Sequence, residues 1–476
     1  MNVADSARLS EGLEALGYRP VPRPEEADVI VLNTCVVRQS AENRAVGRLT
    51  SLKPLKERNP QLVLAVMGCL VGVRPEEGLE RRFSHVDLFL PPSDPEILLS
   101  LLRERRSGAV SRGGGSGDEK QEGEHRGQAA GGRRQEARTQ RRGAAGDLGR
   151  TSPEAAAMGL VAERGTWDAV TLRSPPVAAY VPAILGCDHA CAYCIVPYRR
   201  GRERSRRVED IVAEVQHQVN HGVREVTLLG QIVDRYGRDL KAEGAAPRPD
   251  LADLLRAVHS VQGLWRIRFL TSHPLYLSDR VLDAVAELPK VCEHIEVPVQ
   301  AGDDDVLRRM RRGYSVSQYR LLVQDIRQRI PRCSIATDVI VGFPGESSAQ
   351  FLATYDLLEE SRFDQVHVAA YSPRSGTLAV RKMTDDVSPD EKKRRVTAID
   401  ELQERIVGEI NGKLLGRTVE ILVEGRHKGK WRGRTRTNKL VFFRHHADWH
   451  GRLAAVRITW AGPWSMQGDV EADQGP

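Results

Sequence analysis

Between residues 173 and 407 the chain alternates between short apolar runs and amphipathic helical runs. The apolar runs are typical of buried strands and read AYVPAILG, EVTLLGQ, RIRFLTS, HIEVPVQ, IATDVIVGF and QVHVAAYS, with helical patterns such as VEDIVAEVQHQVNH, LADLLRAVHSV and QYRLLVQDIRQRI between them. Helical connections join parallel strands by right-handed crossovers. Six such units predict a partial parallel barrel, a (βα)6 core, for this part of the chain.

Three cysteines, Cys187, Cys191 and Cys194, follow the first predicted strand in the run GCDHACAYCIVPYRRG. Four-iron clusters are held by thiolates, and three thiolates leave one iron of such a cluster without a protein ligand. Catalytic metal sites keep a position open in the same way. A zinc knuckle or a disulfide is the alternative, but no second Cys/His pair follows at zinc-finger distance. The spacing therefore favours a 4Fe-4S cluster with an open iron.

Five polar residues lie at or near the ends of the later predicted strands. In parallel barrels, catalytic groups collect at the carboxyl ends of the strands. Any one of these residues taken alone is more often structural, but their joint placement predicts contacts to a cofactor or substrate in one shared cavity. They are Gln231, Ser272, His273, Gln300 and Asp338.

Residues 1–103 predict a small Rossmann-like α/β domain. The runs DVIVLNTC and LVLAVMGCL are typical of buried parallel strands, and the helical stretch AENRAVGRLTSLKPLKER separates them. Each run carries a cysteine at its end, Cys35 and Cys69, and ligands bind at that edge of open α/β sheets. Two buried structural cysteines are the alternative.

Residues 104–165 are rich in Gly, Arg, Glu, Gln and Ala, and no aromatic residue occurs between Phe89 and Trp167. Such a segment cannot bury enough apolar surface to offset the entropy of ordering it. We expect a disordered linker here, with an RNA-tethering arm as the alternative.

Residues 408–471 predict a small β-barrel, because short alternating strands are separated by Gly and Asn. Between Lys413 and Arg457 there are twelve Lys/Arg and three Asp/Glu residues. Aromatic side chains are interleaved with these charges, a mixture expected where a basic groove follows a nucleic-acid backbone and rings stack on bases. An ordinary small core is the alternative. The aromatic residues are Trp431, Phe442, Phe443 and Trp449.

The remaining composition is that of an ordinary globular chain, with 28% charged and 40% hydrophobic residues. No stretch reaches the roughly 18 apolar residues of a membrane span, and the N-terminus lacks a signal-peptide pattern. Seven cysteines, three of them clustered, suit a reducing compartment. We expect a cytoplasmic protein in which Cys292 and Cys333 are structural.

The runs GCDHACAYCIVPYRRGRERSR, RIRFLTSHP, HIEVPVQAGDD and TDVIVGFPGES resemble the radical-SAM methylthiotransferases, most closely the branch that modifies adenosine in tRNA. The resemblance implies that the open iron chelates S-adenosylmethionine (SAM) and that a deoxyadenosyl radical removes a hydrogen from adenine C2. A second SAM supplies the methyl group. The target implied is N6-isopentenyladenosine beside the anticodon, and the C-terminal barrel is implied to be an RNA-binding TRAM domain. We further expect a flavodoxin or ferredoxin as electron donor, and a monomer.

In this family three N-terminal cysteines hold an auxiliary 4Fe-4S cluster, and Cys35 and Cys69 match two of them. The first family cysteine falls in a GCQMN-like run, whereas this chain begins with MN and continues with the matching VADSARLSEGLEALGY. We therefore expect the written chain to start too late, with a first strand and the third cysteine upstream. Otherwise His85 or an exogenous ligand completes the cluster, or sulfur transfer is lost while SAM cleavage is kept.

Two departures bear on the target. The family's usual Asn after Gln231 is here Ile232, and its later Asn is Asp234. One alternative is therefore a methylthiotransferase acting on threonylcarbamoyl adenosine or on a ribosomal-protein aspartate. The other, made plausible by the missing third N-terminal cysteine, is an RNA-binding iron-sulfur protein with impaired sulfur transfer.

Overall fold

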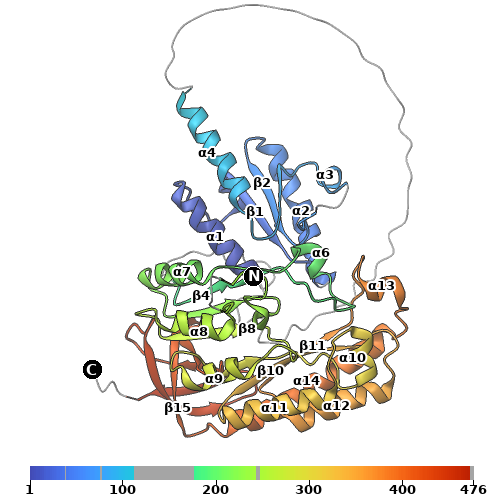
Figure 1. Cartoon of the computed structure of the whole chain (residues 1–476). Coiled ribbons are helices and arrows are strands. Elements are labelled where there is room, and N and C mark those ends of the chain that lie inside the picture. The colour runs from blue at the N-terminus through green and yellow to red at the C-terminus, as the bar shows by residue number, and fades with distance from the viewer. Residues whose placement is uncertain (38, 75–77, 112–175, 243–246, 472–476) are drawn as a thin grey trace, which may run out of the picture.

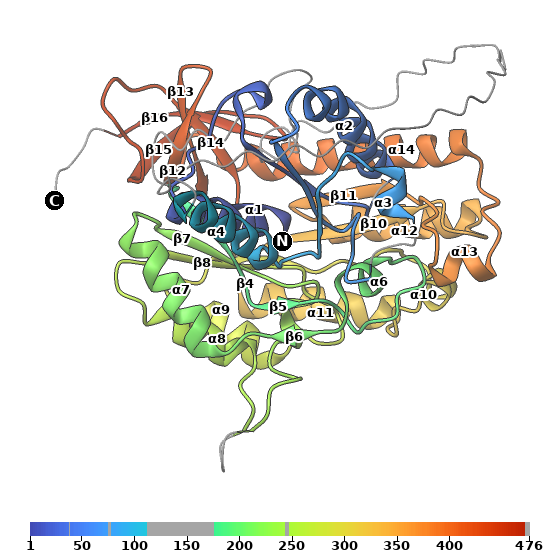
Figure 2. The same ribbon diagram turned by 90° about the horizontal axis from the view of Figure 1, so that it is seen from above.

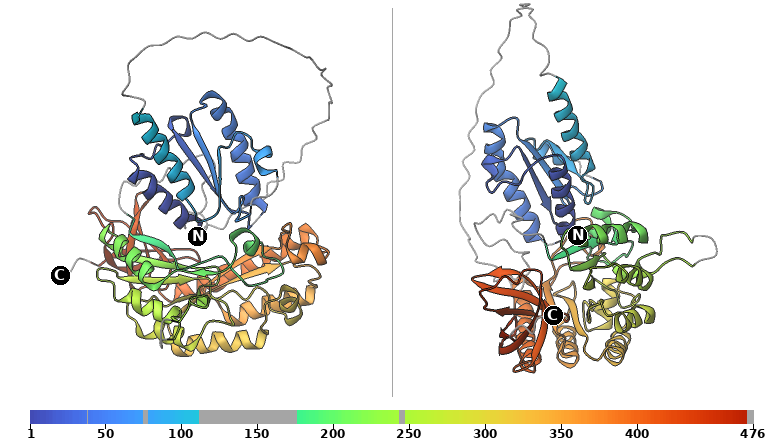
Figure 3. Two further views of the ribbon diagram at one scale, coloured as in Figure 1. Left: turned by 45° about the horizontal axis from the view of Figure 1, so that its top comes forward. Right: turned by 90° about the vertical axis from the view of Figure 1, so that its left-hand side faces the viewer.

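The computed structural model describes residues 1–37, 39–74, 78–111, 176–242 and 247–471. An N-terminal α/β domain lies over one side of a central barrel, and a small C-terminal β-barrel packs at the end of the central barrel opposite to α6 (Val196–Arg200) (Figures 1 and 3). Most of the predicted linker lies outside the described residues, but α4 (Glu96–Ser111) covers its first part. Among the described helices, none is long and apolar enough to cross a membrane.

The N-terminal domain is built on a three-stranded parallel sheet in the order β1-β2-β3. Strands β1 and β2 are aligned so that Thr34, the last residue of β1, pairs with Gly68. Helices α1 and α4 cover one face and α2 the other, so every residue of β2 is buried. The elements are α1 (Asn2–Ala15), η1 (Pro24–Glu26), β1 (Val29–Thr34), α2 (Gln39–Arg58), β2 (Val63–Gly68), α3 (Leu79–Arg82), β3 (Leu88–Leu90) and α4.

The central region confirms the predicted partial barrel. Six of its eight strands form two parallel sheets, β4-β7-β8 and β9-β10-β11, and β5 pairs antiparallel with β6. The sheets are joined by a bridge between Ile267 and Val291 and by a 3.0 Å hydrogen bond from Ser272 N to the Glu296 carbonyl. The elements are β4 (Ala178–Pro182), β5 (Ile184–Leu185), α6, β6 (Arg204–Ser205), α7 (Val208–Asn220), β7 (Glu225–Leu229), η2 (Val233–Arg235), α8 (Leu251–His259), β8 (Arg266–Leu270), α9 (Asp279–Glu287), β9 (His294–Glu296), α10 (Asp304–Met310), α11 (Val316–Arg329), β10 (Ser334–Val341), α12 (Ser348–Ser361), β11 (Gln365–Ala370), α13 (Leu378–Lys382) and α14 (Pro389–Gly412).

Local signals explain where the barrel helices begin and which face they bury. In α11 the Ser315 hydroxyl accepts a hydrogen bond from Gln318 N, and the Gln318 side chain accepts one from Ser315 N. Such caps satisfy otherwise unpaired N–H groups and contribute about 1 kcal/mol each. In α7, Ile211, Val215 and Val219 recur at every fourth position and are all buried. This spacing gives one apolar stripe, which packs against the barrel.

The C-terminal region forms a closed barrel in the order β12-β13-β14-β16-β15, as predicted. Trp431, Phe443 and Trp449 are 5%, 1% and 6% exposed and belong to its core. The prediction that these three rings stack on RNA is therefore wrong, because the interior of a small barrel must be filled by side chains. Phe442 is the one of the four that points outward. The strands are β12 (Thr418–His427), β13 (Lys430–Thr435), β14 (Leu440–Phe443), β15 (Leu453–Ala461) and β16 (Met466–Val470).

A hairpin, residues 434–439, docks the C-terminal barrel onto the amino ends of the central strands (Figure 2). Arg268 on β8 donates hydrogen bonds to the carbonyl oxygens of Thr435, at 2.8 Å, and Arg436, at 2.7 Å. Its Nε also donates to Glu225 Oε1 at 2.8 Å. Arg268 and Glu225 are both buried, so the hairpin supplies the acceptors that a buried guanidinium needs.

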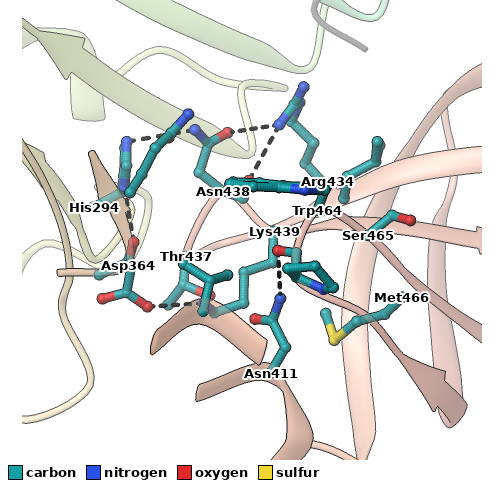
Figure 4. Close-up of a pocket in the computed structure, with 15 residues that line it drawn as sticks. His294, Asp364, Asn411, Arg434, Thr437, Asn438, Lys439, Trp464, Ser465 and Met466 are labelled. Carbon is teal, nitrogen blue, oxygen red and sulfur yellow. Dashed lines mark hydrogen bonds and ion pairs between the residues drawn. The ribbon is translucent and has the colours of Figure 1, made fainter. Parts of the chain in front are cut away.

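The hairpin also reaches into the central barrel with its own side chains. Arg436 pairs with Glu293 at 2.8 Å, and Lys439 pairs with Asp364 at 2.8 Å. A cavity of about 40 Å³ lies in this seam, with Asn411 beneath it (Figure 4). Such a volume holds only a few water molecules, and the cavity lies at the opposite end of the strands from the three clustered cysteines.

Candidate active site

Cys187, Cys191 and Cys194 lie in one loop between β5 and α6, at the carboxyl end of the barrel. Gly186 opens this loop with φ of 72°, and a Cβ atom there would lie 2.0 Å from the Arg202 carbonyl oxygen. A side chain therefore cannot be accommodated at this turn. The close backbone approach fixes where the loop leaves the strand.

Of the three thiols, Cys191 ionises most readily. Burial opposes its ionisation, but a 3.3 Å hydrogen bond with His189 and the charge of Arg312 outweigh burial and lower the pKa of Cys191 to about 7. Arg312 Nη1 also donates to Cys191 Sγ at 3.3 Å. Burial raises the pKa of Cys187 to about 11 and that of Cys194 to about 12. Because thiolates bind metals, the loop offers one thiolate near neutral pH, and cluster binding must displace the other two protons.

His273 lies against the cysteine loop. Its ring centroid is 4.6 Å from that of His189 and 5.2 Å from that of Tyr276. Its backbone N–H donates to Asp234 Oδ2 at 2.8 Å. Burial, followed by the charge of Arg312, lowers the pKa of His273 to about 2. The ring is therefore neutral and serves as a hydrogen-bonding group.

Three buried polar atoms of this region have no hydrogen-bond partner within the described chain. They are Asp234 Oδ1, Ser272 Oγ and His273 Nε2. Buried polar groups in folded proteins are nearly always paired, so these atoms retain capacity for a ligand. Burial raises the pKa of Asp234 to about 7, which lets its carboxyl group donate as well as accept near neutral pH.

The other predicted site residues lie on neighbouring strands. Gln300 N donates to the Asp338 carbonyl at 2.9 Å. Gln300 and Thr271, which follow β9 and β8, have φ of 72° and 70°, a strained conformation that clusters at functional sites. Asp338 lies within β10; burial and then its charge raise the pKa of Glu296 to about 8. Gln231 follows β7 and is half-buried, and no hydrogen bond within the described residues joins it to the others.

Cys35 and Cys69 follow the paired ends of β1 and β2 at one edge of the N-terminal sheet. Cys69 N donates to the Thr34 carbonyl at 3.0 Å. Burial raises the pKa of Cys69, and the charge of Arg200 opposes this. Arg200 ends α6, just after the cysteine loop, and donates to Asn2 Oδ1 at 2.6 Å. One guanidinium therefore connects the N-terminal thiol region with the helix of the cysteine loop.

Comparisons with known proteins assign each region. Residues 181–358 match the Radical SAM superfamily, residues 412–470 match the TRAM domain, and residues 1–91 match the group described as Uncharacterized protein family UPF0004. A tRNA-2-methylthio-N(6)-dimethylallyladenosine synthase from Roseiflexus sp. (strain RS-1) is 45% identical, over 98% of this chain and 87% of that protein. The protein of the same name from Herpetosiphon aurantiacus is 40% identical, over 99% of this chain and 95% of its own.

The chain belongs to the tRNA-2-methylthio-N(6)-dimethylallyladenosine synthase family. The predicted resemblance to radical-SAM methylthiotransferases is thereby confirmed. Among solved structures, coproporphyrinogen III oxidase (HemN) from Escherichia coli is 17% identical with a TM-score of 0.38, covering 49% of this chain and 54% of that one. A likeness at that level adds nothing to the family assignment.

The radical-SAM assignment of this synthase family implies SAM and a 4Fe-4S cluster, and the donor chemistry of the cysteine loop fits one. Within the described residues, no three His, Cys, Asp or Glu side chains converge as the ligands of a single metal ion would. A four-iron cluster does not require this, because each thiolate binds a different iron. His85, considered above as a further ligand in the N-terminal domain, is bonded instead to the Leu49 carbonyl at 2.9 Å.

Two residues at the mouth of the barrel in this family member were not among the predicted site residues. His189 lies inside the cysteine run, so its position in the sequence could have indicated it. Arg312 lies 121 residues after Cys191, and no local pattern marks it. Only the fold shows that its guanidinium is the positive neighbour of the thiol.

Proposed function

We propose that this protein adds a methylthio group to C2 of N6-isopentenyladenosine next to the anticodon of tRNA, by radical-SAM chemistry. One observation carries the proposal: the chain matches the synthases over nearly its whole length and presents three thiols on one loop at the carboxyl end of its barrel. Catalytic groups gather at that end of parallel barrels. The single-stranded anticodon loop suits the reaction, because a loop base can be splayed out of its stack.

Cys187, Cys191 and Cys194 hold the SAM-binding 4Fe-4S cluster in this proposal. When bound, that cofactor supplies the reductive cleavage of SAM and thereby the radical that activates an aromatic C–H bond. The role of the chain is to hold cofactor and base in register and to exclude water. Arg312 stabilises the Cys191 thiolate through the 3.3 Å hydrogen bond.

We assign the contacts to SAM or to the target base to the polar residues of the same end of the barrel. Ser272 Oγ and His273 Nε2 are buried and unpaired within the described chain, which leaves them able to bind a polar ligand. Gln300 and Asp338 are adjacent through their backbones, and Gln231 stands at the end of the neighbouring β7. Polar groups converging on a cavity fix the orientation of a ligand.

Cys35 and Cys69 hold the auxiliary 4Fe-4S cluster in this proposal, and Arg200 offers a positive charge beside it. A flavodoxin or ferredoxin supplies electrons, and the protein acts as a monomer. All seven cysteines are free, which suits the reducing cytoplasm where tRNA is modified. The TRAM domain contributes the binding of tRNA.

The test is anaerobic reconstitution with iron and sulfide, followed by SAM, a reductant and isopentenylated tRNA. Digested tRNA is then analysed by mass spectrometry for the methylthio nucleoside, and 5′-deoxyadenosine is measured in the same reaction. Product formation supports the proposal. Product only on threonylcarbamoyl adenosine or on a ribosomal-protein aspartate reassigns the target, and deoxyadenosine without any methylthio product indicates that sulfur transfer is impaired.

A further inference from the structure

Strand β15 turns one tryptophan outward where its own alternation would bury it. Ala454, Val456 and Ile458 are buried and the residues between them are exposed. If this alternation continued, Trp460 would also face the interior of the barrel. It is nevertheless 49% exposed. The pairing of β15 with β16 shifts register between Ile458 and Trp460, so Thr459 is an extra residue that rotates Trp460 to the outside.

Such a bulge has a function more often than it is a defect. Bulges re-aim single side chains, and they are over-represented at sheet edges, at the rims of barrels and next to active sites. An indole left 49% exposed forgoes the stabilisation that burial of its apolar surface would give. Tryptophan is also a side chain favoured at binding surfaces, because it offers a large rigid face.

Trp460 stands at the end of a row of outward side chains that crosses four neighbouring strands. The register places Trp460 opposite Gln467 on β16, Gln467 opposite Phe442 on β14, and Phe442 opposite Arg432 on β13. We call these four residues the outer row. Adjacent strands are about 4.8 Å apart, so the row spans roughly 14 Å across the sheet.

Positive and polar groups flank the outer row. Lys430 Nζ donates to Gln467 Oε1 at 2.5 Å and thereby orients the amide. The His427 ring lies 6.2 Å from Phe442. Among the described residues no ion pair joins Lys430 or Arg432 to an acidic side chain, whereas Arg436 and Lys439 are engaged with Glu293 and Asp364 in docking.

We propose that the outer row is the surface on which the TRAM domain stacks unpaired bases of the tRNA substrate. Aromatic side chains on a sheet stack successive bases, and cations beside them contact the phosphates. Phe442 and Trp460 supply the two rings, the Gln467 amide can bond a base edge, and Lys430 and Arg432 supply the charge. This inference rests on the proposed function for the identity of the RNA.

The test measures binding of the full-length protein to a fluorescein-labelled isopentenylated anticodon stem-loop by fluorescence anisotropy. Trp460→Ala should weaken binding by roughly 5- to 150-fold, the loss of one stacked base, and Trp460→Phe should retain most of the affinity. Trp265→Ala is the matched control, since Trp265 is 37% exposed on the central barrel, beside Arg224. Binding by Trp460→Ala within two-fold of the unmodified protein overturns the inference.

Salt dependence separates stacking from a general loss of structure. Trp460→Ala should leave the slope of log K against log[salt] unchanged, because no charge is removed. Lys430→Gln should reduce that slope by about 0.7, the value for one phosphate contact on a single strand. An unchanged slope in Lys430→Gln contradicts the assigned phosphate contact.

The inference and the proposed function fail in different ways. If the unmodified protein makes methylthio adenosine and Trp460→Ala binds RNA normally, the assignment of base stacking to the outer row is wrong and the proposed function is supported. If Trp460→Ala loses affinity for RNA and the unmodified protein forms no methylthio product, the assignment of base stacking to the outer row is supported and the proposed function is contradicted. SAM cleavage without RNA should be the same in all variants.

Discussion

The two ends of the central barrel treat buried polar side chains in opposite ways. At the amino end, Arg268 is buried with Glu225 and with carbonyl acceptors from the TRAM hairpin. At the carboxyl end, Ser272 Oγ and His273 Nε2 are buried without partners in the described chain. A buried charge is tolerated only when paired, so the amino end serves docking and stability. The carboxyl end retains buried polar atoms without hydrogen-bond partners in the described chain, and it can therefore bind a polar ligand.

The largest expected effect comes from removing a thiol at the carboxyl end. Cys191→Ala should lower the rate of SAM cleavage by more than about 100-fold, because the cluster loses its one readily ionised ligand. Thermal unfolding of the cluster-free protein should shift by only a few degrees, since Cys191 is only half-buried. Deoxyadenosine is measured by mass spectrometry. Normal cleavage in this variant would refute the assignment of the cysteine loop.

Removing a charge at the amino end should instead cost stability. Arg268→Met leaves Glu225 buried, and breaking a buried pair costs about 3–5 kcal/mol. Arg266 lies 4.0 Å from Glu225 and compensates in part, so we expect the lower end of this range. Urea unfolding measures the change.

The double variant Arg268→Met with Glu225→Gln is the control, because it removes both charges. It should recover part of the lost stability. Equal stability of Arg268→Met and the unmodified protein would show that the hairpin is not held by this arginine.

The pH dependence of the free energy of unfolding should report on a buried carboxyl group at the carboxyl end. Burial raises the pKa of Asp234 from 3.8 to about 7, so between these values the unfolded chain ionises while the folded chain keeps its proton. Folding therefore loses stability as the pH rises from about 4 to about 7, and the loss then stays constant. Asp234→Asn should remove this loss, on the order of 4 kcal/mol.

The measurement for Asp234→Asn is urea unfolding of the cluster-free protein at both ends of that pH range. Relative to the unmodified protein, the variant should gain stability as the pH rises. A constant difference between the two proteins across the range would mean that Asp234 titrates normally.

The smallest effect is expected at Cys333, a residue to which we assign neither docking nor ligand binding. Cys333 is half-buried, and its thiol donates to the Ser334 carbonyl at 3.5 Å. Cys333→Ala should cost less than about 1 kcal/mol and leave methylthio transfer unchanged. A loss of iron per chain in this variant would contradict the structural assignment of Cys333.

Periodicity predicted the fold because each barrel strand carries its own apolar run. All six runs became strands, and the short C-terminal strands closed into a barrel. The same reasoning failed for Trp431, Phe443 and Trp449, since composition cannot tell which face of a strand an aromatic residue occupies. It also gave no sign of Trp460, whose exposure depends on a register shift between two strands.

The sequence by itself determined the family, the cysteine loop and the succession of strands and helices along the chain, because motif spacing and strand periodicity are local properties of the chain. The tertiary structure alone decided that Arg312 reaches Cys191, that Arg268 holds the TRAM hairpin, and that Arg200 joins the two thiol regions. These contacts join residues far apart in the chain. They exist because burying a guanidinium requires acceptors, and only the tertiary packing of the chain decides which acceptors are within reach.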